Sequence, residues 1–394
     1  MARLTVDRLD LGGRRVFLRV DFNVPLADGR ISDDTRIAAA LPTLEHCVKA
    51  GASVVLASHL GRPKGKADPR YSLAPVAARV SESLGQPVEL LPDCVGPAVV
   101  ERVNALGPGQ VIMLENLRFH PEEEANDEGF ARELAALATV YVDDAFAAAH
   151  RAHASIEAIT RFLRPAAAGL LMARELSALA RVVEGAERPV WAVLGGAKVS
   201  DKLALVENLL GRVDGLAVGG GMAFTFLTAL GHTVGRSLVE PDRIEVARTV
   251  LDRARSRGVP VRLPVDVVAA TGVDDETGLR TVAIRDIPTE LMGLDIGPAT
   301  VSQFRAALGS ARTIIWNGPM GVFERPAFAA GTLGVARAVA ESSAFSVVGG
   351  GDTIAALQQA GVTDRIGYIS TAGGAFLEFL EGRELPGVAA LDPA

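Results

Sequence analysis

Short runs of β-branched and other apolar residues alternate with longer segments of helical period along the whole chain. The runs lie at residues 15–20, 53–58, 110–115 and 139–144 in the first half and at 190–195, 215–220, 312–318 and 345–351 in the second. This alternation is typical of βαβ units, in which helices cover a parallel sheet. We therefore predict an α/β protein with mainly parallel sheets, arranged as two Rossmann-like three-layer α/β/α domains.

A segment of helical period lies between the two series of strands. Its apolar side chains fall on one face at three- and four-residue spacing, and they are Leu176, Leu179, Val182 and Val183. We predict a connecting helix over 172–186, although an ordinary core helix has the same pattern. It joins a first domain of residues 1–171 to a second domain of residues 187–379. Because no Gly/Ser linker is present, relative motion of the domains would be a hinge about this helix.

Composition excludes several classes of protein. Residues 1–170 carry 19 basic and 22 acidic side chains, net −3, and residues 171–394 carry 21 and 25, net −4, which sums to −7. Neither half has the basic excess that nucleic-acid binding requires, so we expect no nucleic-acid partner. We also expect no membrane contact, because no apolar run approaches ~18 residues and the first ten residues lack the centre of a signal peptide.

The two cysteines, Cys47 and Cys94, cannot form a disulfide framework. Neither lies in a CxxC motif or at metal-ligand spacing from a histidine, which indicates a reducing compartment and a cytoplasmic protein. Neither follows a predicted strand, and no GxSxG motif is present, so we expect no covalent catalysis.

Ligands of open α/β sheets bind at the carboxyl ends of the strands, so the residues that follow each strand are informative. After the first-half strands these residues are mostly arginine and histidine, and they are Asp21, Asn23, His59, Arg62, Arg118, His120, His150, Arg151 and His153. Several guanidinium groups that converge on one point repel one another unless an anion is present. The first half therefore predicts a site for a small, multiply charged anion, and the cationic surroundings of His59, His150 and His153 disfavour zinc at these three residues.

Glycine-rich turns follow the second-half strands, at 195–198, 219–221, 317–319 and 349–353. A backbone without Cβ atoms can approach phosphate groups closely and donate N–H groups to them. Lys198 and Lys202 would lie one turn apart on a helix that opens after Gly195 and Gly196, and Asp352 could hold a divalent cation that bridges phosphates. Each turn alone could simply connect a strand to a helix, but several together predict a nucleotide site.

Neither GxxxxGK[ST] nor a helix-opening GxGxxG is present, which disfavours P-loop NTPases and Rossmann dehydrogenases. The sequence favours direct phosphoryl transfer, because it predicts one site for a small anion, a second site for a nucleotide with its metal, and no nucleophile. This reaction needs only positioning and neutralisation of charge.

Nine segments together resemble the phosphoglycerate kinase family, in family order along the whole chain. They are RVDFNVP (19–25), SHLGRP (58–63), ENLRF (115–119), HRAH (150–153), LGGAKVSDK (194–202), GGGMAFTF (219–226), MGLDIGP (292–298), WNGPMGVFE (316–324) and GGGDT (349–353). The resemblance implies a glycolytic kinase, usually monomeric, that transfers a phosphoryl group reversibly from 1,3-bisphosphoglycerate to Mg-ADP. Transfer would be in line after hinge closure, without a covalent intermediate. The resemblance also implies that the C-terminal tail of about 380–394 returns to the first domain.

The resemblance also implies the roles of individual residues. The triose-phosphate site would comprise Asp21, Asn23, Arg36, His59, Leu60, Gly61, Arg62, Arg118 and Arg151. The nucleotide site would comprise Gly195, Ala197, Lys198, Lys202, Gly220, Gly221, Gly293, Leu294, Asn317, Glu324, Gly350, Gly351, Asp352 and Thr353. Arg36, Lys198 and Gly373 would be catalytic, and Asp352 would hold Mg²⁺.

The chain departs from the family pattern at two places. Ala372 replaces a glycine in STAGGA (370–375), which would be strained if that position needs a positive φ, and Ala147-Ala148 replace Gly-Thr before HRAH. Two other functions stay open on the sequence, a non-catalytic sensor that closes on a small anion and another small-molecule kinase with two α/β domains. Formation of ATP from ADP, tested against a panel of acyl phosphates, separates these alternatives.

Overall fold

The computed structural model describes residues 2–394, and the chain forms two compact units. The first comprises Met1–Ser177 with Glu384–Ala394, and the second comprises Ala178–Arg383. Helix α6 (Leu170–Val183) begins in the first unit and ends in the second. In residues 2–394 no helix is both long and apolar enough to cross a bilayer.

The first unit contains a six-stranded parallel sheet of order β5-β6-β4-β1-β7-β8. Its strands are β1 (Arg15–Arg19), β4 (Ser53–Ala57), β5 (Val88–Leu90), β6 (Val111–Met113), β7 (Val140–Asp143) and β8 (Ala166–Ala168). The four strands predicted in this half are confirmed to within two residues. A short hairpin of β2 (Leu26–Ala27) and β3 (Arg30–Ile31) lies outside the sheet.

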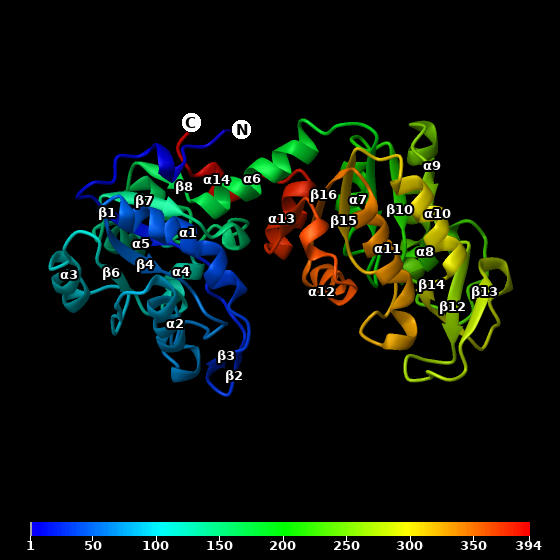
Figure 1. Ribbon diagram of the computed structural model, residues 1–394, viewed down its shortest axis with the longest axis horizontal. Coiled ribbons are helices and arrows are strands. Elements are labelled where there is room, and N and C mark those ends of the chain that lie inside the picture. Colours follow the sequence, from blue (N-terminus) through cyan, green and yellow to red (C-terminus); the bar gives the residue numbers. More distant parts are fainter. Residues whose placement is uncertain (1) are drawn as a thin grey trace. The chain divides into compact units, whose positions relative to one another are not determined.

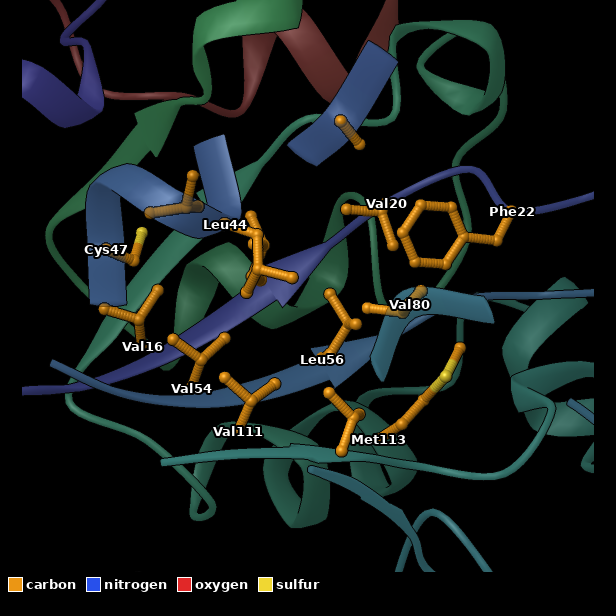
Figure 2. Close-up of a cluster of buried hydrophobic side chains, with 14 of the residues drawn as sticks. Val16, Val20, Phe22, Leu44, Cys47, Val54, Leu56, Val80, Val111 and Met113 are labelled. Atoms are coloured by element: carbon orange, nitrogen blue, oxygen red, sulfur yellow. The ribbon is translucent and has the colours of Figure 1, made fainter. Parts of the chain in front are cut away.

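Both faces of this sheet are buried, as expected for parallel strands with continuous apolar sequences. On one face, Val16, Val54 and Val111 pack with the side chains of α1 (Thr35–Lys49) and α2 (Ala74–Leu84), as Figure 2 shows. On the other face, the rings of Phe17 and Tyr141 stack at 6.1 Å. The remaining helices of the unit are α3 (Pro97–Asn104), α4 (Pro121–Glu124), α5 (Glu128–Ala135) and α14 (Pro386–Ala389).

The C-terminal tail packs on the first unit. Asp392 N–H donates to Ala166 O at 2.9 Å, and Asp392 O accepts from Leu4 N–H at 2.8 Å. The Asp392 carboxylate also pairs with Arg164. These bonds attach the end of the chain to β8 and to the N-terminal segment.

The second unit contains another six-stranded parallel sheet, of order β11-β10-β9-β15-β16-β17, which carries helices around it (Figure 1). Its strands are β9 (Val190–Leu194), β10 (Gly215–Val218), β11 (Val261–Arg262), β15 (Thr313–Asn317), β16 (Phe345–Gly349) and β17 (Tyr368–Ser370). The helices are α7 (Leu203–Leu209), α8 (Met222–Ala229), α9 (Ile244–Ser256), α10 (Pro298–Leu308), α11 (Ala330–Glu341), α12 (Gly351–Ala360) and α13 (Gly373–Leu380). The predicted α/β class with mainly parallel sheets is confirmed.

The sequence analysis missed β11 and β17 of the second unit and a separate small sheet. β12 (Asp266–Ala270) pairs antiparallel with β13 (Arg280–Ala283) and with β14 (Met292–Ile296) in a separate three-stranded sheet. β14 carries Gly293 and Leu294, two of the residues expected at the nucleotide site.

Candidate active site

Asp21 and Arg36 form an ion pair at the basic site of the first unit. Asp21 follows β1, and its Oδ2 accepts a 2.6 Å bond from Arg36 Nη1 on α1. Burial by itself raises the pKa of Asp21, but the charge of Arg36 and the Asn23 amide lower the pKa to about 2. Asp21 is therefore ionised at neutral pH and holds the Arg36 guanidinium in place.

Behind this pair lies a buried network centred on Arg19, which the sequence analysis missed. The Arg19 side chain is fully buried at the end of β1, donates to Ser155 Oγ at 2.8 Å and lies 3.2 Å from His59 Nδ1. Its counter-charge is Glu123, also fully buried, whose carboxylate accepts from Ser155 N at 2.9 Å and Ser155 Oγ at 2.6 Å. Burial is the main cause that keeps the pKa of His59 well below its usual value, so His59 is neutral at neutral pH.

The backbone of residues 60–61 is held from two sides. Asn116 accepts from Leu60 N–H at 3.2 Å and donates to Leu60 O at 2.7 Å, while the Leu60 side chain lies in the hydrophobic core. Gly61 N–H donates to Asn23 Oδ1 at 2.8 Å, and Gly61 O accepts from Arg118 Nη1 at 2.8 Å. Gly61 has φ +62°, and a Cβ atom there would lie 2.4 Å from the Tyr71 ring, so only glycine fits.

Positive groups crowd the same side of this sheet. Burial lowers the pKa of Arg118, and the nearby charges of Arg19 and Arg151 lower it further. Burial likewise lowers the pKa of His153 to about 3, with Arg19 and Arg118 as further causes. Among the described residues, Arg118 Nε and His153 Nδ1 are buried and have no hydrogen-bond partner, although the Glu124 carboxylate lies 3.4 Å from Arg118 Nε. A multiply charged anion would supply the missing acceptor for the Arg118 guanidinium.

Nine residues are expected at the triose-phosphate site. All of them except Arg62 are connected by the hydrogen bonds described above or by electrostatic effects on one another's pKa values. Arg151 donates from Nε to His150 Nε2 at 3.2 Å. Arg62 follows Gly61 directly and is exposed to solvent.

In the second unit, the glycine-rich turns line two adjoining cavities of about 380 Å³ and about 340 Å³. The larger cavity has mainly apolar walls, and the predicted residues along it are Ala197, Gly220, Gly221, Gly293, Leu294, Glu324 and Asp352. The smaller cavity is more polar, and the predicted residues along it are Ala197, Lys198, Lys202, Asn317, Gly350, Gly351, Asp352, Thr353 and Gly373. Together they suit a molecule with a flat apolar part and a charged part.

Gly195 is buried and lines neither cavity. Its N–H donates to Asn317 O at 3.0 Å, and a Cβ atom there would lie 2.1 Å from Pro319 O. The sequence analysis missed most of the apolar wall of the larger cavity, including Phe224 and Leu238. Phe224 lies within GGGMAFTF and could have been found there, whereas Leu238 has no local signal.

Lys202, Asn317 and Asp352 organise the polar cavity. Lys202 Nζ bonds Asn317 Oδ1, and Asn317 Nδ2 donates to Gly349 O at 2.7 Å. Burial lowers the pKa of Lys202, and the carboxylates of Asp201 and Asp352 partly oppose this effect. Thr353 Oγ accepts from Gly318 N–H at 2.8 Å, which ties the turn after β15 to the first turn of α12.

The prediction that Lys198 and Lys202 share a helix is wrong, because α7 begins at Leu203. Glu240 is the physical reason. Its carboxylate accepts from Val199 N at 2.5 Å, Ser200 N at 3.1 Å and Ser200 Oγ at 2.6 Å, and these bonds hold the segment as turns. Lys198 therefore sits on an exposed loop at the wall of the polar cavity.

Asp352 fits the ligand chemistry of a magnesium ion. It is an exposed carboxylate in the first turn of α12, and it lines both cavities. Mg²⁺ prefers oxygen ligands and commonly binds one or two protein carboxylates together with phosphate oxygens.

Of the two departures from the family pattern, the one at residue 372 causes no backbone strain. Ala372 has φ −96°, a value that alanine adopts without strain, so the cost considered from the sequence does not arise. Ala147 and Ala148 lie in the short 3₁₀ helix Phe146–Ala148.

Comparisons with known proteins agree with these observations. A family model described as phosphoglycerate kinase matches residues 6–383. The phosphoglycerate kinase of Desulfosudis oleivorans is 56% identical over 385 residues, which are 98% of this chain and 97% of that protein. The phosphoglycerate kinase of Anaeromyxobacter sp. (strain K) is 54% identical over 395 residues, and the match covers 100% of both chains. The solved structure of phosphoglycerate kinase from Coxiella burnetii matches with a TM-score of 0.92, 43% identity and 98% coverage of each chain. The enzyme from Pyrococcus horikoshii matches with a TM-score of 0.85, 38% identity and the same coverage.

Proposed function

The chain belongs to the phosphoglycerate kinase family, and from this premise we propose how its residues transfer a phosphoryl group between 1,3-bisphosphoglycerate and ADP. The observation that carries the proposal is the contrast between the two units. The first offers crowded, partly unpaired cationic groups, and the second offers glycine-lined cavities with lysine and carboxylate groups.

The first unit would bind the triose phosphate. Arg36, His59, Arg118 and Arg151 surround the anion, and Arg62 reaches it from the exposed loop. Asp21 and Asn23 bind the glycerate part, because both are polar and half-buried beside Arg36. Leu60 and Gly61 contribute backbone groups that Asn116 and Arg118 hold in place.

The second unit would bind the nucleotide. The apolar cavity takes the base and ribose, with Gly220, Gly221, Gly293 and Leu294 against the base and Glu324 at the ribose. The polar cavity takes the phosphates, and the predicted residues along it are Ala197, Lys198, Lys202, Asn317, Gly350, Gly351, Thr353 and Gly373. Gly195 lies outside this cavity and would support its wall through the bond from its N–H to Asn317 O. Asp352 would hold the Mg²⁺ that accompanies the nucleotide, and this ion would supply neutralisation of phosphate charge.

Because the two substrates bind different units, transfer requires closure about α6 that brings donor and acceptor into line. Closure also excludes water from the acyl phosphate. Arg36 and Lys198 then neutralise the transferring group, together with N–H groups near Gly373. We infer direct transfer, in which no residue of the two cavities forms a covalent bond to the phosphoryl group.

Lys198→Ala tests the central role. We expect kcat to fall at least about 100-fold, as for other groups that stabilise charge in the transition state, with little change in the Kd of Mg-ADP by calorimetry. Lys64→Ala, a change of an exposed lysine in the first unit, is the control. Equal losses in kcat and in nucleotide affinity would assign Lys198 to ground-state binding instead.

A panel of acyl phosphates tests the substrate. We expect ATP to form from ADP with 1,3-bisphosphoglycerate and not with acetyl or carbamoyl phosphate, because only the former carries the second phosphate that the basic site binds.

A cytoplasmic monomer is part of the same proposal, and sedimentation at assay concentration tests its oligomeric state.

A further inference from the structure

Asp93, Cys94 and His120 form a cluster in the first unit that the proposed function does not use. One potential ligand atom from each of the three residues lies within 4.8 Å of the other two. No second group of three His, Cys, Asp or Glu side chains within residues 2–394 meets this condition. Asp93 and Cys94 lie between β5 and α3, and His120 follows the 3₁₀ helix Leu117–Phe119.

The packing of this cluster fixes its side chains. Cys94 is fully buried, and its N–H donates to Asp93 Oδ1 at 2.6 Å. The same Oδ1 lies 2.7 Å from His120 Nε2, and the imidazole stacks on the Phe130 ring at 5.1 Å. The sulfur, the imidazole nitrogen and the carboxylate therefore converge without any rearrangement of the backbone.

We propose that Asp93, Cys94 and His120 form a binding site for Zn²⁺. Thiolate, imidazole and carboxylate are the ligands that zinc takes in proteins, at about 2.3, 2.0 and 2.0–2.2 Å, and a site with three protein ligands leaves the fourth position to water. Two nitrogen or oxygen ligands of a tetrahedral zinc ion lie about 3.3 Å apart, so the observed contacts need shifts on the order of 1 Å. Asp93 can make such a shift because its side chain is 49% exposed.

The ligand set separates this site from the one at Asp352. Mg²⁺ demands oxygen ligands and does not use a thiol, whereas zinc is borderline-soft and binds sulfur well. When zinc binds, a Zn–S bond replaces the S–H bond of Cys94, and the proton leaves to solvent.

Two other interpretations of the cluster give different chemistry. A reactive cysteine would need an accessible thiolate, but Cys94 is buried, and burial raises the pKa of its thiol well above the usual value. An ordinary His120–Asp93 hydrogen bond would need no cysteine and would bind no metal tightly.

Bound zinc would also affect the neighbouring anion site. His120 lies two residues after Arg118, and Asp93 O accepts from Glu115 N–H at 3.4 Å, so both ends of the segment 115–120 contact the cluster. An ion would fix this segment to the loop between β5 and α3. Zinc binding is therefore expected to stabilise the first unit.

Titration of the full, tag-free chain with Co²⁺ and then Zn²⁺ tests the proposal. We expect one Co²⁺ per chain, a sulfur-to-cobalt charge-transfer band in the near ultraviolet, and loss of the band when Zn²⁺ is added. Cys94→Ser should abolish the band, and His120→Asn should weaken binding at least about tenfold. Cys47→Ser is the matched control, because Cys47 is equally buried but packs among apolar side chains of α1 and β1 (Figure 2), and it should leave the band unchanged.

Three outcomes would overturn the proposal. They are no stoichiometric binding of Co²⁺ or Zn²⁺, binding without a thiolate band, and a band that disappears in Cys47→Ser rather than in Cys94→Ser. If a variant fails to fold by circular dichroism, zinc-edge X-ray absorption on the unmodified chain decides the question. One sulfur and one imidazole in the zinc shell support the site, and a shell without sulfur refutes it.

Discussion

The buried pair of Arg19 and Glu123 gives the sharpest prediction about how the first unit maintains its basic site. Glu123→Gln keeps the shape of the side chain but removes the negative charge. The Arg19 guanidinium, whose side chain is also 0% exposed, would then lose its counter-charge. The amide would also place N–H groups where the carboxylate now accepts from Ser155 N and Oγ.

The size of the effect follows from the geometry. Arg19 Nη2 lies 3.9 Å from Glu123 Oε1. At an effective dielectric constant of about 20, this separation corresponds to about 4 kcal/mol. Removal of one member of a buried ion pair commonly costs about 3–5 kcal/mol, so we expect a loss of about 4 kcal/mol in the stability of the first unit.

Two probes can follow the two units separately. Both tryptophans, Trp191 and Trp316, lie in the second unit, so their fluorescence reports on its unfolding in urea. Hydrogen exchange of peptides from β1 and β7 reports on the first unit. Glu123→Gln should accelerate exchange in β1 and β7 strongly and change the tryptophan transition little.

The neighbouring Glu124→Gln is the control. Glu124 is 47% exposed and lies 3.4 Å from Arg118, so its loss should cost no more than about 1 kcal/mol. If Glu123→Gln destabilised the first unit by no more than Glu124→Gln does, the argument for a desolvated ion pair behind the basic site would be refuted.

Two further predictions concern backbone strain and pH. Gly61→Ala should raise the KM for 3-phosphoglycerate and destabilise the first unit by at least about 1 kcal/mol, because φ is +62° and the new Cβ atom would clash with the Tyr71 ring. A KM equal to that of the unsubstituted chain would contradict this prediction. Gly13→Ala is the control, because Gly13 also has a positive φ but a Cβ atom there would lie in open space. Burial raises the pKa of Asp295 to about 7, so its folded form holds a proton that its unfolded form, with a pKa near 3.8, has lost. This stabilising contribution is complete below the unfolded pKa and disappears as pH rises through about 7, so the second unit should lose about 3 kcal/mol between pH 5 and 8 from this group. Asp295→Asn should remove that part of the pH dependence in urea unfolding followed by tryptophan fluorescence, and an unchanged slope would refute the assignment.

Much of the fold and the family could be predicted from the sequence. Buried parallel strands are continuous apolar runs, and the candidate site residues come directly after these runs. The predicted phosphoglycerate kinase family is confirmed by the comparisons. The roles of the individual site residues and the division into domains at 171 and 187 stay predictions.

Long-range interactions explain what the sequence analysis missed. The helix expected after Gly196 begins only at Leu203, because Glu240, forty residues further on, caps the amides of Val199 and Ser200. Arg19 lies inside a strand pattern, and Glu123 lies within an acidic run typical of a solvated helix end, so neither predicts a buried pair.

The cluster of Cys94 and His120 was missed for a similar reason. The two residues are 26 positions apart, and they meet because β5 and β6 are neighbours in the sheet, so the segments that follow them lie at the same edge. The antiparallel sheet of β12 to β14 was missed because β13, RTVA, is partly polar and exposed, and because a glycine and an aspartate interrupt the apolar run of β14, MGLDI.

The most direct measurement of the central claim is the stereochemical course of phosphoryl transfer. The substrate is 1,3-bisphosphoglycerate whose acyl phosphate is made chiral with oxygen isotopes, and the configuration of the γ-phosphoryl group of the resulting ATP is determined. Transfer directly from one substrate to the other inverts the configuration, and inversion is the predicted result. Net retention would require two successive displacements through a phosphorylated residue, and it would contradict a mechanism that uses only positioning and charge neutralisation.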